Sequence, residues 1–480
     1  MTNKNGSVVP AAQELETFLP IDSVNGVTKY KIQPAKKDVE NGGVAEFNPF
    51  LERKNDHPTS DNETLTHLLK ASLGTGILAM PFAFKCSGLL FGIFATVVTA
   101  FICTHCSYIL VKCAHTLYIR TRRTAMNFSE VAEVAFANGP KWGRRYAKFF
   151  KVLILQSLFW TYFGTCSVYT VIIAENFKQV AEYYLGYKLP IGECIAYCLL
   201  PLIALSWVPN LKYLAPVSMV ANLLMGSGLG ITFYYLVADL KPVSSVPAMG
   251  TLTTIPEFIS ITIFAMEAIG VVMPLENQMK TPGNFVGICG VLNKGMSGVT
   301  LVYILLGFLG FLRYGSDTAA SITLNLPTEE IPAQAVKIFI ALAVFCTFGL
   351  QFYVCVEIGW NAIKDNFKQR PLLVNYVFRT VLVTAAVLLA VAVPTISPFI
   401  GLIGAFCFSI LGLLVPVAIE FVTYWDSGFG PCNWIVFKNV IICIFGIFAL
   451  VFGSKDAIHG ILKQYSTPET TANVTQALHQ

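Results

Sequence analysis

Long apolar segments alternate with short polar ones through most of this chain of 480 residues. Each apolar segment is about as long as the 20 residues that a helix needs to cross the hydrocarbon core of a bilayer, roughly 30 Å thick. The pattern therefore predicts an all-α, polytopic membrane protein. We expect eleven transmembrane helices, at residues 64–87, 89–115, 147–177, 190–208, 211–237, 255–276, 286–312, 333–362, 371–393, 396–424 and 433–453.

Composition agrees with a membrane protein and disfavours other classes. Only 13% of the residues are charged and 55% are apolar, whereas a soluble domain carries about 25% charged residues. The net charge of +5 comes from clusters near predicted helix ends and gives no reason to expect a nucleic-acid partner. Most of the 13 cysteines lie in apolar segments, where cysteine packs as a small apolar residue. The sequence contains no pair of CxxC motifs with metal-ligand spacing and no nucleophile–base set. We therefore predict that the protein binds no metal ion or organic cofactor and is not an enzyme.

The polar ends of the chain predict two tails around the membrane domain. Residues 1–60 lack an apolar core segment, so they cannot bury enough surface to offset the entropy cost of ordering. We predict a disordered cytosolic tail over 1–60, a transmembrane domain over 61–456 and a second tail over 457–480. Asn48-Pro49-Phe50 in the first tail is a candidate motif for cytosolic trafficking or nutrient-signalling partners.

Basic residues predict the orientation of the bundle. The connection between the second and third helices, 112–151, holds nine Lys and Arg against two Glu. Short loops rich in Lys and Arg lie on the cytosolic side. With eleven spans, the N-terminus is then cytosolic and the C-terminus extracellular or lumenal. Asn473 is therefore a predicted glycosylation site, whereas the sequons at Asn5, Asn62 and Asn127 stay bare.

Two predicted helices contain helix-interrupting residues at matching places. The first contains Gly74, Gly76 and Pro81, and the sixth contains Gly270 and Pro274. Gly loosens a helix and Pro removes one of its hydrogen bonds. A matched pair of interrupted segments indicates a transporter of inverted repeats. The expected architecture is a LeuT-type 5+5 inverted repeat with broken helices 1 and 6, plus one extra helix.

The interruptions provide groups that bind a zwitterion. Unwinding frees backbone N–H and C=O groups that lipid cannot satisfy. A carboxylate can accept from N–H groups at the start of a half-helix, and an ammonium can donate to the freed carbonyls. The alternative interpretation is ordinary packing and kinking, since Gly and Pro are common in membrane helices. The predicted substrate-binding residues are Gly74, Thr75, Gly76, Glu267, Ala268 and Gly270.

Short strings spread along the chain carry a family resemblance. They are His67–Lys70, Gly74–Pro81, Leu110–His115, Glu175–Gln179, Glu267–Gln278 and Gln351–Val354. Together they resemble the proton-coupled amino acid transporters, a branch of the amino acid/auxin permease group, from about residue 47 to 455. Asn48-Pro49-Phe50 and the following His57-Pro58-Thr59 are similar to the insect members. The resemblance implies proton-coupled symport of small neutral amino acids, such as glycine, alanine and proline, by alternating access.

The sequence departs from the family in two respects. Ala268 stands where the family more often has Gly, and the extra methyl group would narrow the pocket and change the preferred substrate size. Some relatives have a cystine between the loops after helices three and seven, but residues 313–333 contain no Cys. That bond therefore cannot form.

His67 is the predicted proton-coupling residue. It lies two helical turns before Gly74, on the face of the interruption and roughly 10 Å toward the cytosol. An imidazole changes its charge near neutral pH, and the family implies this role for the matching histidine. Against it, the nearby Lys70 disfavours a charged His67. A structural hydrogen bond between helices is the alternative.

Other ionisable residues in predicted helices are candidates because charges are costly in a membrane. Glu267 beside the sixth-helix interruption can face the substrate ammonium, share the proton, or bond freed N–H groups. Glu357 and Arg379 are a candidate buried ion pair or gate, and a purely structural pair is the favoured interpretation.

Other functions agree with the same residues. A sodium-coupled or exchange transporter of this fold keeps nearly every feature, with Thr347 as a possible cation ligand. A nutrient sensor that binds an amino acid with little flux is an alternative from a different class. The expected surroundings are an amino acid substrate and the lipid bilayer of the plasma membrane, the lysosome or both.

Overall fold

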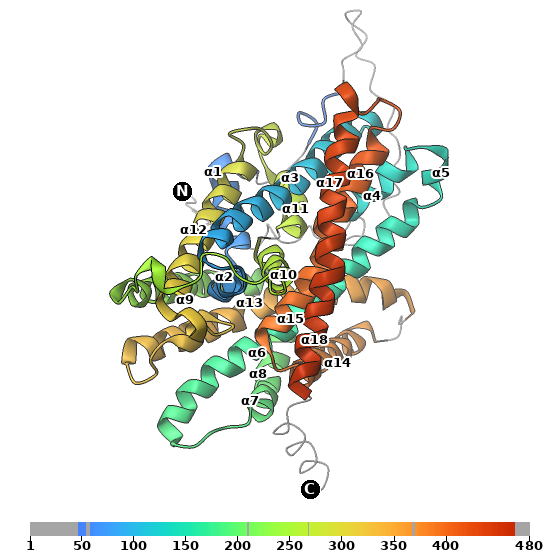
Figure 1. Cartoon of the computed structure of the whole chain (residues 1–480). Coiled ribbons are helices and arrows are strands. Elements are labelled where there is room, and N and C mark those ends of the chain that lie inside the picture. The colour runs from blue at the N-terminus through green and yellow to red at the C-terminus, as the bar shows by residue number, and fades with distance from the viewer. Residues whose placement is uncertain (1–46, 54–57, 209–210, 267, 367–369, 466–480) are drawn as a thin grey trace, which may run out of the picture.

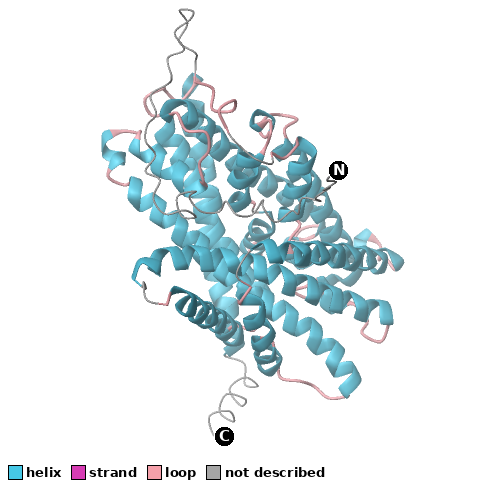
Figure 2. Ribbon diagram, turned by 180° about the vertical axis from the view of Figure 1, so that it is seen from behind, coloured by secondary structure: helices cyan, strands magenta, loops and turns pink. Residues whose placement is uncertain are grey.

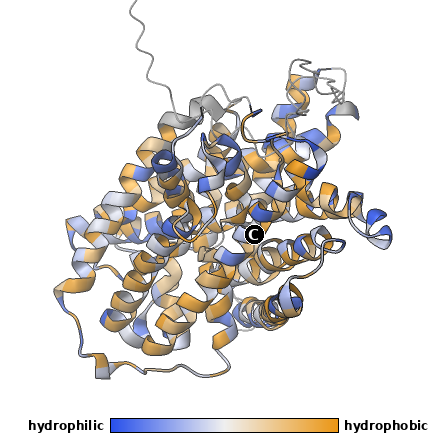
Figure 3. Cartoon of the chain, turned by 90° about the horizontal axis from the view of Figure 1, so that it is seen from above, coloured by the Kyte–Doolittle hydropathy of each residue, from blue (hydrophilic) through white to orange (hydrophobic). Residues whose placement is uncertain are grey.

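The computed structural model describes residues 47–53, 58–208, 211–266, 268–366 and 370–465. Within these residues the secondary structure is helical, and the β-type pairing is limited to a bridge between Thr59 and Met279. Figure 2 shows this all-helical architecture. Apolar residues dominate the helices in Figure 3. The predicted all-α fold class is therefore confirmed.

The first five predicted spans make up one half of the bundle. The first is divided into two half-helices, α1 (Asp61–Ser72) and α2 (Met80–Ser87), with a 3-10 turn at Thr75–Ala79 between them. The next spans are α3, α6, the pair α7 and α8, and α9, with the short helices α4 and α5 between α3 and α6 (Figure 1). Their bounds are Leu89–Thr121 (α3), Phe128–Ala137 (α4), Lys141–Arg144 (α5), Ala147–Leu185 (α6), Ile191–Tyr197 (α7), Leu199–Ser206 (α8) and Leu211–Ala238 (α9).

The second half again begins with a divided span, α10 and α11. It continues through α12, α13 and α14 to a tenth span, in which a π-helical segment at Ile403–Leu414 joins α15 to α16. The extra span contains α17 and α18, joined by a π-helical turn at Ala449–Gly453. The helix bounds are Ile255–Met266 (α10), Ile269–Gln278 (α11), Val291–Tyr314 (α12), Ile331–Ile363 (α13), Pro371–Ala392 (α14), Ile396–Leu402 (α15), Val415–Thr423 (α16), Trp434–Phe448 (α17) and Ser454–Tyr465 (α18).

This order matches the expected five plus five spans and one extra helix. Among the described residues, nine helical segments are long and apolar enough to cross a membrane, and the bent pair that contains α1 and α2 makes a tenth. The predicted fourth span corresponds to the shorter apolar segment Ile191–Ser206. We call the end that carries α4 and α5 the inner end, because the basic connection there predicts a cytosolic location. Figure 1 shows α7 and the end of α18 at the opposite, outer end.

Several helices continue beyond their predicted ends, most of all α6 and the last span. α6 reaches Leu185 and α18 reaches Tyr465, so residues 457–465, predicted as part of the second tail, are helical, and the rest of that tail lies outside the described residues. Hydropathy detects only the apolar part of a helix, whereas polar turns continue where they find partners. In α6, Lys178 pairs with Glu182 at 3.6 Å, and the helix ends at Gly186 with a positive φ of 73°.

The residues before α1 pack on the bundle. The described part of the predicted tail includes residues 47–53, which we call the N-terminal strap, and Arg53 in the strap bonds to Thr124 and Glu276. Thr59 exchanges backbone hydrogen bonds with Gln278 and Lys280 at the end of α11. These residues therefore pack on the inner end, where a disordered tail was predicted, and residues 1–46 and 54–57 of that tail lie outside the described residues.

Close packing beside the first interruption fixes α12 against α2. A Cβ atom added at Gly307 or Gly310 would lie 2.5 Å from side-chain atoms of Phe84 or Pro81. No side chain fits at that distance, so the two glycines allow α12 to approach the half-helix α2. This contact places Tyr303, one turn before Gly307 in α12, beside the interruption.

Candidate functional site

The first interruption lies between α1 and the segment Thr75–Ser87. α1 ends at Ser72, Leu73 adopts a non-helical conformation, and Gly74 is extended, with φ −84° and ψ −163°. The two segments are bent by 47° relative to one another. The interruption predicted from Gly74, Gly76 and Pro81 is therefore present. It lies at Leu73 and Gly74, directly before the 3-10 turn that contains Gly76.

The second interruption lies at the predicted position in the sixth span. α10 ends at Met266 and α11 begins at Ile269, with Ala268 as its N-cap residue at φ −122°. Pro274 lies inside α11. Glu267, one of the predicted substrate-binding residues, lies outside the described residues.

The two interruptions touch one another. A Cβ atom added at Gly76 would lie 2.6 Å from the Cα atom of Ala265 in α10. Figure 1 shows α2 and α10 side by side near the middle of the bundle. Gly270 at the start of α11 has a different neighbour, since an added Cβ would lie 2.6 Å from the hydroxyl oxygen of Tyr162 in α6.

A tyrosine from a third helix joins the two interruptions. Tyr303 in α12 has 0% exposure, and its hydroxyl oxygen lies 2.6 Å from the carbonyl oxygen of Ser72 and 3.1 Å from that of Ala265. The backbone of Gly74 also interacts with this hydroxyl. The structure thus brings the end of α1, the end of α10 and the first predicted binding residue to one polar group.

The half-helices present opposite partial charges at the interruptions. The last four carbonyls of a helix and its first four N–H groups lack partners within the helix. α1 and α10 therefore end in carbonyls with partial negative charge, while Thr75–Ser87 and α11 begin with N–H groups carrying partial positive charge. Such an arrangement can bind an ammonium on one side and a carboxylate on the other.

Thr75 contributes a hydroxyl to the same region. The residue is 3% exposed, and its oxygen makes no well-formed hydrogen bond to any residue that the structure describes. Tyr169 of α6 interacts more loosely with Thr75 and with Gln351 of α13. A buried hydroxyl with spare capacity is costly unless a ligand or water completes its hydrogen bonds.

Four residues of this region were missed as site residues by the sequence analysis. They are Tyr162, Tyr169, Tyr303 and Gln351, contributed by α6, α12 and α13. Tyrosines are frequent in this chain, with 19 copies, so the type alone gives no signal. Gln351 lies in a string that carries the family resemblance, which is the one sequence feature that marks it.

His67 lies on α1, on the inner side of the first interruption. It is half-buried and interacts electrostatically with Glu63, one turn earlier. Glu63 in turn forms a capping box with Ser60 at the start of α1. The predicted proton-coupling residue therefore belongs to the half-helix whose end points at Tyr303.

The predicted charge pair of Glu357 and Arg379 involves α13 and α14. Arg379 in α14 is 6% exposed and donates to Asn375 and to the carbonyls of Ser206 and Val208, at 2.7–3.0 Å. Its guanidinium also lies over the ring of Tyr353. These contacts connect α14 to the end of α8, and the pairing of Arg379 with Glu357 stays a prediction.

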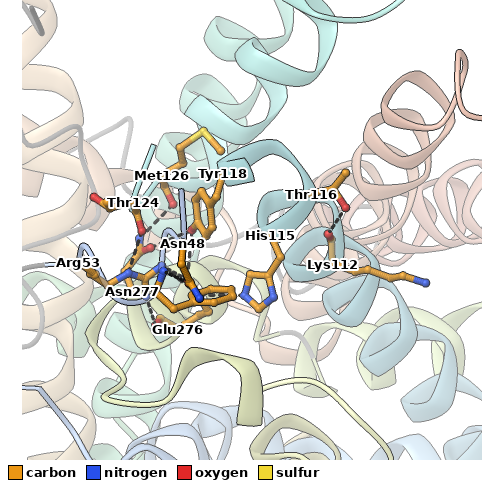
Figure 4. A network of polar contacts seen from close by, with 11 residues as sticks. Asn48, Arg53, Lys112, His115, Thr116, Tyr118, Thr124, Met126, Glu276 and Asn277 are labelled. Carbon is orange, nitrogen blue, oxygen red and sulfur yellow. Dashed lines mark hydrogen bonds and ion pairs between the residues drawn. The ribbon is translucent and has the colours of Figure 1, made fainter. Parts of the chain in front are cut away.

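A separate polar cluster lies at the inner end, around the buried carboxylate of Glu276 in α11 (Figure 4). Glu276 has 0% exposure and accepts hydrogen bonds from Arg53 at 3.2 Å and Tyr118 at 3.1 Å. His115 of α3 lies 2.9 Å from the same carboxylate. Arg53 also donates to the backbone of Glu276 and of Thr124. The cluster connects the N-terminal strap, α3 and α11 through one buried charge.

Two cavities lie outside the interruptions. One, of about 90 Å³, lies between α10, α15 and α18 and is lined by Glu257, Ser397 and Asp456 among others. The other, of about 370 Å³, lies at the inner end between Asp61 and Lys294. No group of three or more His, Cys, Asp or Glu side chains within the described residues is arranged to bind a metal ion.

Comparison with known proteins places the chain in a family. The family described as transmembrane amino acid transporter protein matches residues 57–459. The proton-coupled amino acid transporter-like protein pathetic of Drosophila melanogaster is 66% identical over 460 residues, which cover 96% of this chain and 97% of the relative. The probable amino acid transporter skat-1 of Caenorhabditis elegans is 23% identical over 432 residues, covering 87% and 93%.

Solved structures whose backbone partly matches that of this chain include Mhp1, a nucleobase-cation-symport-1 family transporter, in a closed conformation with bromovinylhydantoin bound. The match has 15% identity and a TM-score of 0.47 and covers 86% of this chain and 95% of that one. A sodium-coupled sialic acid symporter in an outward-open state matches with 12% identity and a TM-score of 0.47, covering 82% and 88%. The extent of the family match and the identity to the Drosophila relative show that the chain belongs to the transmembrane amino acid transporter family and is not an enzyme.

Proposed function

We propose that the chain is a proton-coupled symporter that moves small neutral amino acids across a membrane by alternating access. The observation that carries this proposal is the meeting of two interrupted helices whose ends have opposite partial charges. A zwitterion is complementary to such a site without any charged side chain. The Drosophila relative, named proton-coupled, supports the choice of coupling ion.

In this proposal the substrate contacts mainly backbone groups. The ammonium donates to the carbonyls at the ends of α1 and α10, and the carboxylate accepts from N–H groups at Thr75 and Gly76 or at the start of α11. Thr75 supplies a hydroxyl with spare hydrogen-bonding capacity. Glu267 belongs to the proposed site through its position in the sequence between α10 and α11.

Close packing around the interruptions favours a small substrate. Gly76 leaves no room for a side chain against Ala265, and Tyr162 closely approaches Gly270. Ala268, 7% exposed, adds a methyl group at the start of α11. A site bordered in this way accommodates glycine, alanine or proline more readily than a large side chain.

His67 is the proposed proton acceptor, because it lies on the half-helix that ends at the interruption. Protonation there would change the charge on the element that contacts the substrate ammonium. The proposed topology keeps His67 on the cytosolic side, the N-terminus in the cytosol and the glycosylation site Asn473 outside or in a lumen.

Transport assays in oocytes test the proposal. We expect uptake of labelled glycine, alanine and proline, with an inward current, that increases at acidic external pH and is independent of sodium. His67→Ala should abolish the acid stimulation at equal surface expression. His459→Ala, which changes an exposed histidine of α18, serves as the control and should retain it.

Each other outcome assigns a different function. Uptake that is indifferent to pH but dependent on sodium would replace the proton with a sodium ion as coupling ion. Binding of an amino acid without accumulation, despite confirmed surface protein, would identify a sensor instead.

A further inference from the structure

The hydroxyl of Tyr303 lies within hydrogen-bond distance of two carbonyl oxygens but has a single proton. It lies 2.6 Å from the carbonyl oxygen of Ser72 and 3.1 Å from that of Ala265. A phenolic hydroxyl donates one hydrogen bond and can accept others. At any moment one of the two carbonyls therefore faces the hydroxyl without receiving its proton.

Both carbonyls belong to helix ends that carry partial negative charge. Ser72 is the last residue of α1, and Ala265 is the last but one of α10. Their carbonyls are among those that lack a partner in their own helix. Two C-terminal helix ends repel one another when they converge, unless a donor or a cation lies between them. Tyr303 is fully buried, so bulk water cannot take that place.

We propose that Tyr303 is a positioning residue for the ammonium group of the substrate. Its hydroxyl keeps the carbonyls of Ser72 and Ala265 close enough for one ammonium to bind both. This inference rests on the proposed amino acid transport and adds a residue on α12 to a site otherwise made by the two interrupted helices.

The chemistry of the three groups explains the arrangement. A primary ammonium has three N–H donors, enough for both carbonyl oxygens and for one further acceptor. The Tyr303 hydroxyl can be that acceptor while it donates its own proton to one carbonyl. Binding then completes hydrogen bonds that are short by one proton in the empty site, and a low-dielectric environment strengthens each of them.

Packing keeps Tyr303 in this position. α12 approaches the half-helix α2 closely at Gly307 and Gly310, one and two turns beyond Tyr303. α12 also packs on α1, because a Cβ atom added at Gly295 would lie 2.6 Å from Leu68. Tyr303 lies between these two contacts along α12, so its hydroxyl is held at the end of α1, between the two half-helices of the first span.

Tyr303→Phe tests this inference because it removes the hydroxyl and retains the ring. We expect the purified variant to bind labelled glycine about tenfold more weakly, the loss that corresponds to one hydrogen bond to a charged group. In uptake assays the KM should rise by a similar factor, with little change in maximal rate per transporter at the surface. Tyr314→Phe changes a partly buried tyrosine at the far end of α12, beside Arg313, and should leave both values unchanged.

Thermal unfolding of the empty protein separates positioning from a structural role. If Tyr303→Phe lowers the unfolding temperature but leaves the dissociation constant for glycine as in the wild type, Tyr303 only joins helices and the inference is wrong. If the wild-type protein itself binds no amino acid, the proposed function fails and the ammonium site fails with it. Weaker binding by a variant that unfolds near the wild-type temperature supports the inference.

Discussion

Two glycines of the first interruption have very different surroundings, although they are separated by one residue. Gly76 packs against the backbone of Ala265, whereas a Cβ atom at Gly74 would meet no atom of the described residues within 4 Å. The φ of Gly74 is −84°, a value that any L-residue adopts. Gly76 is therefore required for contact between the interrupted helices, while Gly74 leaves open space at the proposed site.

This contrast gives a matched pair of substitutions. Gly76→Ala should destabilise the protein by about 1–3 kcal/mol, because the added methyl group overpacks the contact between the two interruptions. Gly74→Ala should leave the thermal unfolding temperature of the purified protein near that of the wild type. Equal loss of stability in both variants would show that the close approach at Gly76 is not specific.

The sequence predicted some residues of the site but not how they are connected. Gly74, Thr75, Gly76, Ala268 and Gly270 follow from a pattern of helix-interrupting residues along the chain, and the structure places them at two touching interruptions. The bond from Tyr303 to Ser72 joins residues far apart in sequence. A local pattern contains no information about such a contact, so a tyrosine in an apolar helix looked like ordinary packing.

At the scale of elements, the order of spans and both interruptions were predictable, because each depends on local composition. Apolar length predicts a span, and Gly with Pro predicts where a span is interrupted. The division of the fourth span into α7 and α8 was missed, although Pro201, the third residue of α8, lacks the N–H that would continue the hydrogen bonds of α7. The N-terminal strap was also missed, because Arg53 finds its partners at Thr124 and Glu276, in distant parts of the chain.

The strap contributes a buried ion pair whose loss can be measured. Arg53 and Glu276 are 4% and 0% exposed at their side chains, and removal of one partner of a buried pair costs about 3–5 kcal/mol. Deletion of residues 1–53 should therefore lower the thermal unfolding temperature markedly, as Glu276 keeps only His115 and Tyr118 as partners from α3.

Deletion of residues 1–46 is the control for the strap. It removes the chain before the strap and leaves Phe50 in edge-on contact with His115 and Arg53 in its ion pair. This shorter deletion should unfold near the wild-type temperature. If both deletions behave alike, the strap does not stabilise the inner end.

At the scale of the whole molecule, the described spans combine close contacts between helices with two points of interruption. α12 packs closely on both half-helices of the first span, since an added Cβ atom would lie 2.6 Å from Leu68 of α1 at Gly295 and 2.5 Å from Phe84 of α2 at Gly307. At the inner end, Asp61 of α1 also accepts hydrogen bonds from Thr281 and Asn284, which follow α11. The two half-helices are therefore connected through α12 as well as through the interruption. In the proposed alternating access, a change in the angle between them would have to include α12.

The most direct test of the account uses the purified chain in proteoliposomes with an imposed proton gradient. We predict that labelled glycine accumulates when the outside is more acidic than the lumen, without sodium, and that a protonophore abolishes the accumulation. Accumulation that follows a sodium gradient instead, or uptake that occurs only against preloaded amino acid, would contradict proton-coupled symport.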